Sequence, residues 1–173
     1  FNMAGFTLTK KGTNIVALVA TTISNPGNID VVEGVFGFHT TGALPGSATN
    51  TLTVRSGASA DFYSNPGSKV WTMVLEDGKV TTSNGTNSNW AGPGSLAGTT
   101  GGTFDITSGQ AFIFNGNIGQ SAAGKQLIKS GAGTLVLSGN NTFSGGFTLN
   151  DGVVRLGAAN AFPNANALTM TGT

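Results

Sequence analysis

Residues 129–157, which read KSGAGTLVLSGNNTFSGGFTLNDGVVRLG, decide the fold of this chain. Three short runs in this stretch alternate apolar side chains with small or polar ones, and Gly, Asn, Ser or Asp bounds each run. An alternation of period two predicts β-strands that bury one face. The predicted inward residues are Leu135 and Leu137, then Phe147 and Leu149, then Val154 and Leu156.

The links between these runs are Gly-rich corners of varied length, and none reads as a two-residue Asn-Gly hairpin loop. A chain that winds in one sense around a narrow core fits this pattern better than an up-and-down meander. The sequence therefore predicts an all-β fold, a parallel β-helix or β-solenoid.

The same stretch resembles the passenger-associated repeat of bacterial autotransporters. That repeat runs close to Lys-x-Gly-x-Gly-Thr-Leu-x-Leu-Ser-Gly-x-Asn-Thr-aromatic-x-Gly and closes on Leu-Gly, and residues 129–143 and 153–157 match it. The resemblance implies a right-handed parallel β-helix in a secreted protein of the bacterial cell surface. It also implies a structural or adhesive role, either as the stalk of a passenger or as a protomer of an extracellular fibre.

An internal repeat extends the same pattern over the chain, because residues 4–54 match residues 123–170 at an offset of 118 to 119 residues. Every proposed inward position is apolar in both copies, so we expect both copies to occupy the same station in a stack of coils. We expect residues 1–173 to form one segment of a longer rod, with roughly seven to eight coils of about 20 to 25 residues each. The predicted core stack is Val16, Leu18, Ile29, Val31, Phe36, Phe38, Leu52, Val54, Leu135, Leu137, Phe147, Leu149, Val154, Leu156, Leu168 and Met170.

The composition excludes several classes of partner. Charged residues make up 9% of the chain, with 8 Lys plus Arg against 7 Asp plus Glu, which is too sparse and too even for binding nucleic acid. No apolar run approaches the roughly 20 residues of a membrane-spanning helix. The absence of Cys suits an exported chain. We interpret the chain as an excised or mature segment of a longer secreted protein, whose ends meet further coils or other copies of itself.

Catalytic residues are not expected. His39 is the only His and Cys is absent, so a nucleophile relay lacks its parts. Glu33, Asp77 and Asp151 each precede Gly, which is typical of turns. We expect no metal and no cofactor. The alternative class is a β-helix polysaccharide lyase or hydrolase, which would bring two carboxylates together on an outer face.

Residues 83–102 are rich in Ser, Asn, Gly and Thr, and we interpret them as one long polar loop. An exposed Trp90 beside Asn89 would be able to stack on a sugar ring or to contact a host receptor or another partner. The alternative is that Trp90 packs down onto the solenoid. The glycosylation spacing at residues 84–86 and 140–142 is expected by chance in an Asn-rich solenoid, and no modification is assigned.

Overall fold

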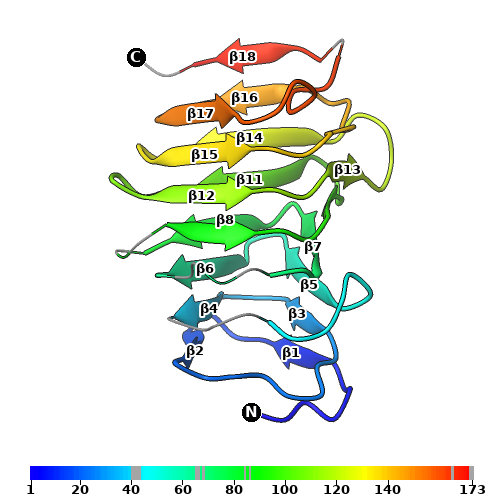
Figure 1. Cartoon of the computed structure of the whole chain (residues 1–173), viewed down its shortest axis with the longest axis vertical. Coiled ribbons are helices and arrows are strands. Elements are labelled where there is room, and N and C mark those ends of the chain that lie inside the picture. The colour runs from blue at the N-terminus through cyan, green and yellow to red at the C-terminus, as the bar shows by residue number, and fades with distance from the viewer. Residues whose placement is uncertain are drawn as a thin grey trace.

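The chain is a parallel β-solenoid, which confirms the predicted fold class. The computed structural model describes residues 1–39, 44–64, 67, 69–83, 85, 87–164 and 166–171. These residues form 18 strands and no helix, and every pairing between strands is parallel. The two termini lie at opposite ends of the stack of strands (Figure 1). None of the described segments is a helix long and apolar enough to cross a membrane.

The strands form three sheets that share one interior. The six-stranded sheet contains, in order along the stack, β1 (Leu8–Lys10), β3 (Ile29–Val31), β5 (Thr51–Arg55), β7 (Thr72–Glu76), β10 (Gly94–Leu96) and β13 (Ile118–Gln120). The eight-stranded sheet contains β2 (Ile15–Val19), β4 (Val35–His39), β6 (Ser59–Tyr63), β8 (Lys79–Thr82), β11 (Gly101–Asp105), β14 (Gln126–Ser130), β16 (Phe147–Leu149) and β18 (Leu168–Met170). The four-stranded sheet contains β9 (Ser88–Trp90), β12 (Ala111–Phe114), β15 (Thr134–Leu137) and β17 (Val153–Leu156).

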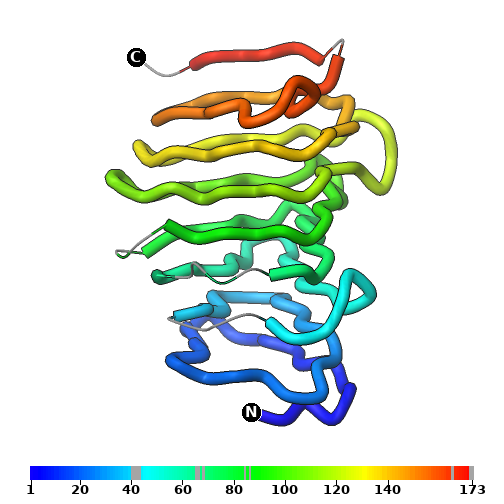
Figure 2. The backbone as a smooth tube through the Cα atoms, viewed as in Figure 1, coloured from blue at the N-terminus to red at the C-terminus, as the bar shows by residue number. Residues whose placement is uncertain are grey.

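Each turn of the solenoid visits the sheets in a fixed order. Successive strands of the eight-stranded sheet begin 20 to 25 residues apart, and the chain makes about seven turns (Figure 2). The six-stranded sheet runs through the N-terminal and middle turns, and the four-stranded sheet runs through the middle and C-terminal turns. Only the eight-stranded sheet therefore spans the whole stack.

The interior is an apolar column in which side chains pack on residues of neighbouring turns and of the other sheets. Phe38 stacks on Phe62 of the next turn, with ring centroids 5.1 Å apart and an interplanar angle of 14°. Phe62 also meets the edges of Trp90 and Phe112 at 6.0 and 5.2 Å. Such aromatic pairs contribute roughly 0.5–1.5 kcal/mol each beyond the burial of their surface.

The residues named for the core stack divide according to their distance from the ends of the solenoid. Leu18, Leu149 and Val154 are partly buried against the core. Val16, Leu156, Leu168 and Met170 are exposed, so their assignment to the core is corrected, because burial in this fold comes from the next turn and they lie on terminal strands. The other nine are buried, and they are Ile29, Val31, Phe36, Phe38, Leu52, Val54, Leu135, Leu137 and Phe147.

The internal repeat does not place its two copies at the same station. Strand β2 belongs to the same sheet as β14, whereas the repeat aligns β2 with β15 of the four-stranded sheet. A match in station would need an offset near 111 residues, since β2 begins at Ile15 and β14 begins at Gln126, five steps along the sheet. The repeat therefore identifies a strand–corner–strand unit that is used on two different sides of the solenoid.

The polar segment 83–102, of which the structure describes residues 83, 85 and 87–102, contains strands, so its interpretation as one long loop is wrong. It contains β9 and β10, and its last two residues begin β11. Ser88 and Trp90 point inward and Asn89 points outward, so the strand alternates although only one of its inward side chains is large and apolar. The pairing of β9 with β12 explains why so polar a sequence forms a strand there.

Candidate functional site

The two residues proposed as a surface contact lie on opposite faces of β9. Trp90 is 0% exposed and pairs with Phe114 in the four-stranded sheet, so its ring is not available to a sugar or a receptor and that interpretation is wrong. Among the residues that the structure describes, its Nε1 group has no hydrogen-bond partner. Asn89 faces outward, where its Oδ1 accepts a hydrogen bond from Asn115 Nδ2 at 2.7 Å one turn further on.

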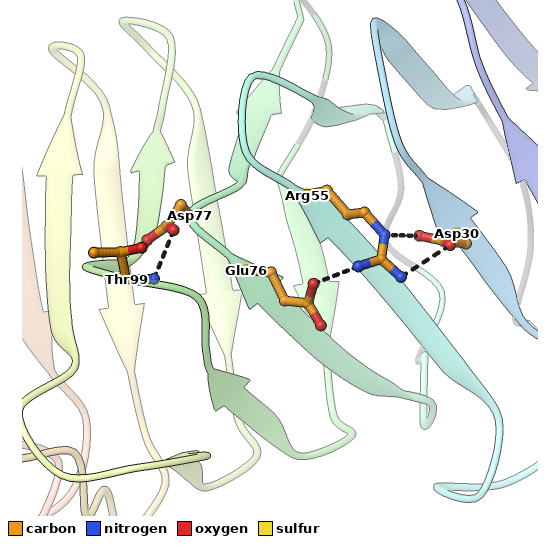
Figure 3. Close-up of polar contacts among 5 residues, drawn as sticks. All are labelled: Asp30, Arg55, Glu76, Asp77 and Thr99. Carbon is orange, nitrogen blue, oxygen red and sulfur yellow. Dashed lines mark hydrogen bonds and ion pairs between the residues drawn. The ribbon is translucent and has the colours of Figure 1, made fainter.

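An ion-pair ladder crosses three turns on the outer face of the six-stranded sheet (Figure 3). Arg55 Nε and Nη2 donate to the two Asp30 oxygens at 2.9 and 3.1 Å, and Nη1 donates to Glu76 Oε2 at 2.6 Å. The hydrogen bonds and then the charge of Asp30 raise the pKa of Arg55; burial opposes them, and the charge of Glu76 adds a smaller rise. The guanidinium thus holds together two carboxylates that like-charge repulsion would otherwise separate.

Asp77 closes the corner between the six-stranded and eight-stranded sheets of the following turn (Figure 3). Its carboxylate accepts the backbone N–H groups of Thr99, Thr100 and Gly101 at 2.7, 2.5 and 3.0 Å. Burial alone would raise the pKa of Asp77, but these three donors together with Lys125 lower it. The residue acts as an anionic cap for main-chain donors.

A second network lies on the outer face of the eight-stranded sheet and is centred on Asp61. His39 Nε2 lies 3.0 Å from Asp61 Oδ2, Thr81 Oγ1 donates to Oδ1 at 2.7 Å, and Ser83 Oγ donates to Oδ2. The ring of Tyr63 contacts that of His39, with centroids 5.7 Å apart. A nucleophile relay requires the serine proton to pass to the imidazole. Ser83 instead donates to the carboxylate, so the arrangement joins three turns and does not activate the hydroxyl.

Every acidic side chain of the chain is engaged by a donor of the protein itself. Beyond the networks above, Glu33 accepts from Gly12 N at 3.0 Å, Asp105 pairs with Lys79 at 3.3 Å, and Asp151 accepts from Gly152 N at 2.6 Å. Across the ranges that the structure describes, no group of three or more His, Asp or Glu side chains is placed to hold a metal ion. Six of the seven carboxylates thus bond to a neighbouring turn, whereas the contact of Asp151 is local.

Three lysines are buried, which the sequence interpretation missed. Lys10 and Lys129 each donate from Nζ to three main-chain carbonyls at a corner, and Lys69 donates to Gly67 O at 2.6 Å. Burial lowers the pKa of Lys69 to about 8. Burial also lowers the pKa of Lys129, although Asp151 and Asp105 oppose this effect. The Lys-x-Gly motif that residues 10–12 and 129–131 share was the sequence signal for these buried lysines.

The architecture defines the class of the protein, a parallel β-solenoid. Its turns are joined by main-chain hydrogen bonds within the sheets and by polar side-chain networks on their outer faces. Residues 127–156, which run through β14 to β17, match the family model of the passenger-associated-transport-repeat. This match confirms the resemblance and is consistent with the β-helix repeat of autotransporter passengers. Comparisons with curated proteins and with solved structures returned no match.

Proposed function

We propose that the chain is a stiff spacer in a secreted or surface-attached protein, where it holds an adhesive or catalytic part at a distance. The observation that carries this proposal is the eight-stranded sheet, which runs unbroken from β2 to β18 and ties each turn to the next. A rod of this kind resists bending because main-chain hydrogen bonds lie along its axis and join each turn to the next. The passenger repeat at residues 127–156 supports an extracellular location.

Exposed apolar side chains at both ends support continuation of the stack. Nine of the eleven large apolar side chains that are exposed lie on the first or the last turn, while Tyr63 and Val70 are the exceptions among the described residues. Strands β2 and β18 are opposite edges of one parallel sheet, so a strand added to either edge extends the same sheet. We propose that further coils cover both ends, supplied by a longer chain or by a second copy. The nine are Phe1, Phe6, Ile15, Val16, Val19, Val153, Leu156, Leu168 and Met170.

Electron microscopy of the chain and of a direct tandem fusion of two copies tests the spacer function. We expect straight rods, with the fusion about twice as long as the single copy. Replacing Met170 by Asp in the first copy should bend or break the rod at the junction, because this side chain is 71% exposed in the single copy and would be covered in the fusion. Val70→Asp is the matched control, since Val70 is exposed on the side of the stack. Beaded or randomly kinked particles from the unmodified fusion would contradict the proposal.

A further inference from the structure

The two corners that contain Lys10 and Lys129 have the same construction on different sides of the solenoid. Lys10 ends β1, before the chain passes from the six-stranded to the eight-stranded sheet, and Lys129 lies in β14, before the chain passes to the four-stranded sheet. Both side chains are buried, at 6% and 0% exposure. The construction therefore belongs to the corner and not to one face of the fold.

Each ammonium is surrounded by three main-chain carbonyl oxygens. Lys129 Nζ donates to Ser130 O at 2.6 Å, to Gly131 O at 2.5 Å and to Asp151 O at 3.2 Å. Lys10 Nζ donates to the corresponding oxygens, Lys11 O at 3.1 Å, Gly12 O at 2.5 Å and Glu33 O at 3.0 Å. In both corners two carbonyls come from the lysine's own turn and the third comes from the next turn. Three acceptors match the three N–H bonds of an ammonium group.

Glycines fix the carbonyls of each cage. Gly131 and Gly152 have φ angles of +70° and +76°, and the equivalent Gly12 and Gly34 have +80° and +71°. A Cβ atom on Gly152 would lie 2.4 Å from Gly131 O, and one on Gly34 would lie 2.3 Å from Gly12 O. The carbonyls are therefore held in place by the backbone itself, independently of the lysine side chain.

The geometry points to a main-chain cation site at each of these corners, whose resident ion is the tethered ammonium of Lys10 or Lys129. Rings of backbone carbonyls bind potassium in the same way, by replacing the water around the ion. The site takes a small monovalent cation, and the covalent tether makes its occupancy independent of the surrounding salt. Since one carbonyl belongs to the next turn, an occupied site locks two turns together.

Removal of the tether tests this inference. In Lys129→Ala the cage remains and the side chain leaves room, so ammonium or methylammonium chloride should raise the thermal unfolding midpoint by about 3 °C over tetramethylammonium chloride at equal ionic strength. Tetramethylammonium matches the charge but is too large and has no N–H donor. The unmodified protein and Lys11→Ala, which removes the exposed neighbour of Lys10, should show no such difference. Equal midpoints of Lys129→Ala in the two salts would overturn the inference.

The unmodified protein supplies a second test if Lys129→Ala does not fold. Nuclear magnetic resonance of the lysine ammonium groups should show slowly exchanging protons for Lys129 and couplings from its ¹⁵Nζ to the carbonyl carbons of Gly131 and Asp151. Lys125 is the control, since its Nζ donates to Thr99 O in an exposed position. Rapid exchange of the Lys129 ammonium protons without these couplings would overturn the inference.

Discussion

Burial of Lys69 should make the protein more stable as the pH rises into the alkaline range, and replacing Lys69 by Met should remove this rise. Lys69 is 0% exposed, and burial lowers its pKa from 10.5 to about 8. Between pH 8 and pH 10.5 the unfolded chain keeps the proton on this lysine and the folded chain loses it. The contribution of Lys69 to the free energy of unfolding therefore rises with pH across this window and is flat below it. A shift of this size corresponds to about 3 kcal/mol, at 1.36 kcal/mol for each pKa unit.

The measurement is urea unfolding of the unmodified protein and of Lys69→Met at intervals from pH 7 to pH 10.5, at constant ionic strength. The difference in unfolding free energy between the two proteins should change by about 3 kcal/mol over the window, with Lys69→Met gaining relative stability at pH 7. Loss of the hydrogen bond to Gly67 O lowers the unfolding free energy of Lys69→Met at pH 7 by roughly 1–3 kcal/mol. This loss does not produce the change of the difference with pH.

Lys11→Met is the matched control, because it makes the same substitution at an exposed lysine and should run parallel to the unmodified protein. Lys129 contributes a rise of the same sign in all three proteins, so it cancels in the differences. Parallel curves for Lys69→Met and the unmodified protein would refute the reasoning, because they would mean that the buried ammonium carries no cost of desolvation.

Three further predictions concern Gly152, Trp90 and Arg55. Gly152→Ala should destabilise by more than about 2 kcal/mol in urea unfolding, because φ is positive and Cβ would meet Gly131 O at 2.4 Å. Gly124→Ala, with φ +83° and open space around Cβ, should cost only about 1 kcal/mol, and equal costs would contradict this. Trp90→Phe should cost less than about 2 kcal/mol and Trp90→Ala about 3–5 kcal/mol, because the buried Nε1 group gains nothing from a partner; a larger loss in Trp90→Phe would show that Nε1 is bonded. Arg55→Met should cost about 1 kcal/mol at low salt and less at 0.5 M NaCl, and no salt dependence would remove the electrostatic role of the ladder.

The alternation of side chains was sufficient to predict strands and a solenoid, but not the sheet to which each strand belongs. A period of two distinguishes inward from outward residues and carries no information about which of three faces a strand occupies. That is why Leu18 and Leu137 match in the sequence and lie in different sheets. Station along the stack is set by the total length of each turn, which varies from 20 to 25 residues because the corners vary.

The outer networks were missed for a related reason. Arg55 is 25 residues from Asp30 and 21 residues from Glu76. These spacings predict no contact along a single strand, but each equals one turn once the length of a turn is known. His39 and Asp61 are 22 residues apart and follow the same rule. Opposite charges or polar partners spaced by one turn were the available signal. The burial of Trp90 could not be read from its own segment, because the aromatic side chains around it come from other turns.

The polar contacts between turns all connect adjacent turns, and this determines where unfolding of the solenoid begins. The hydrogen bonds of Asp77, those of Arg55 and the bond from Lys129 to Asp151 join residues 21 to 25 positions apart, which is one turn in each case. A turn is therefore held only by its two neighbours, as nearest-neighbour models of repeat proteins assume. The terminal turns have one neighbour and exposed apolar side chains, so local unfolding begins there. A central turn such as the one that contains Lys129 can unfold only if its contacts with both neighbouring turns break. Covering the ends with further coils raises the stability of every turn without any change in its sequence.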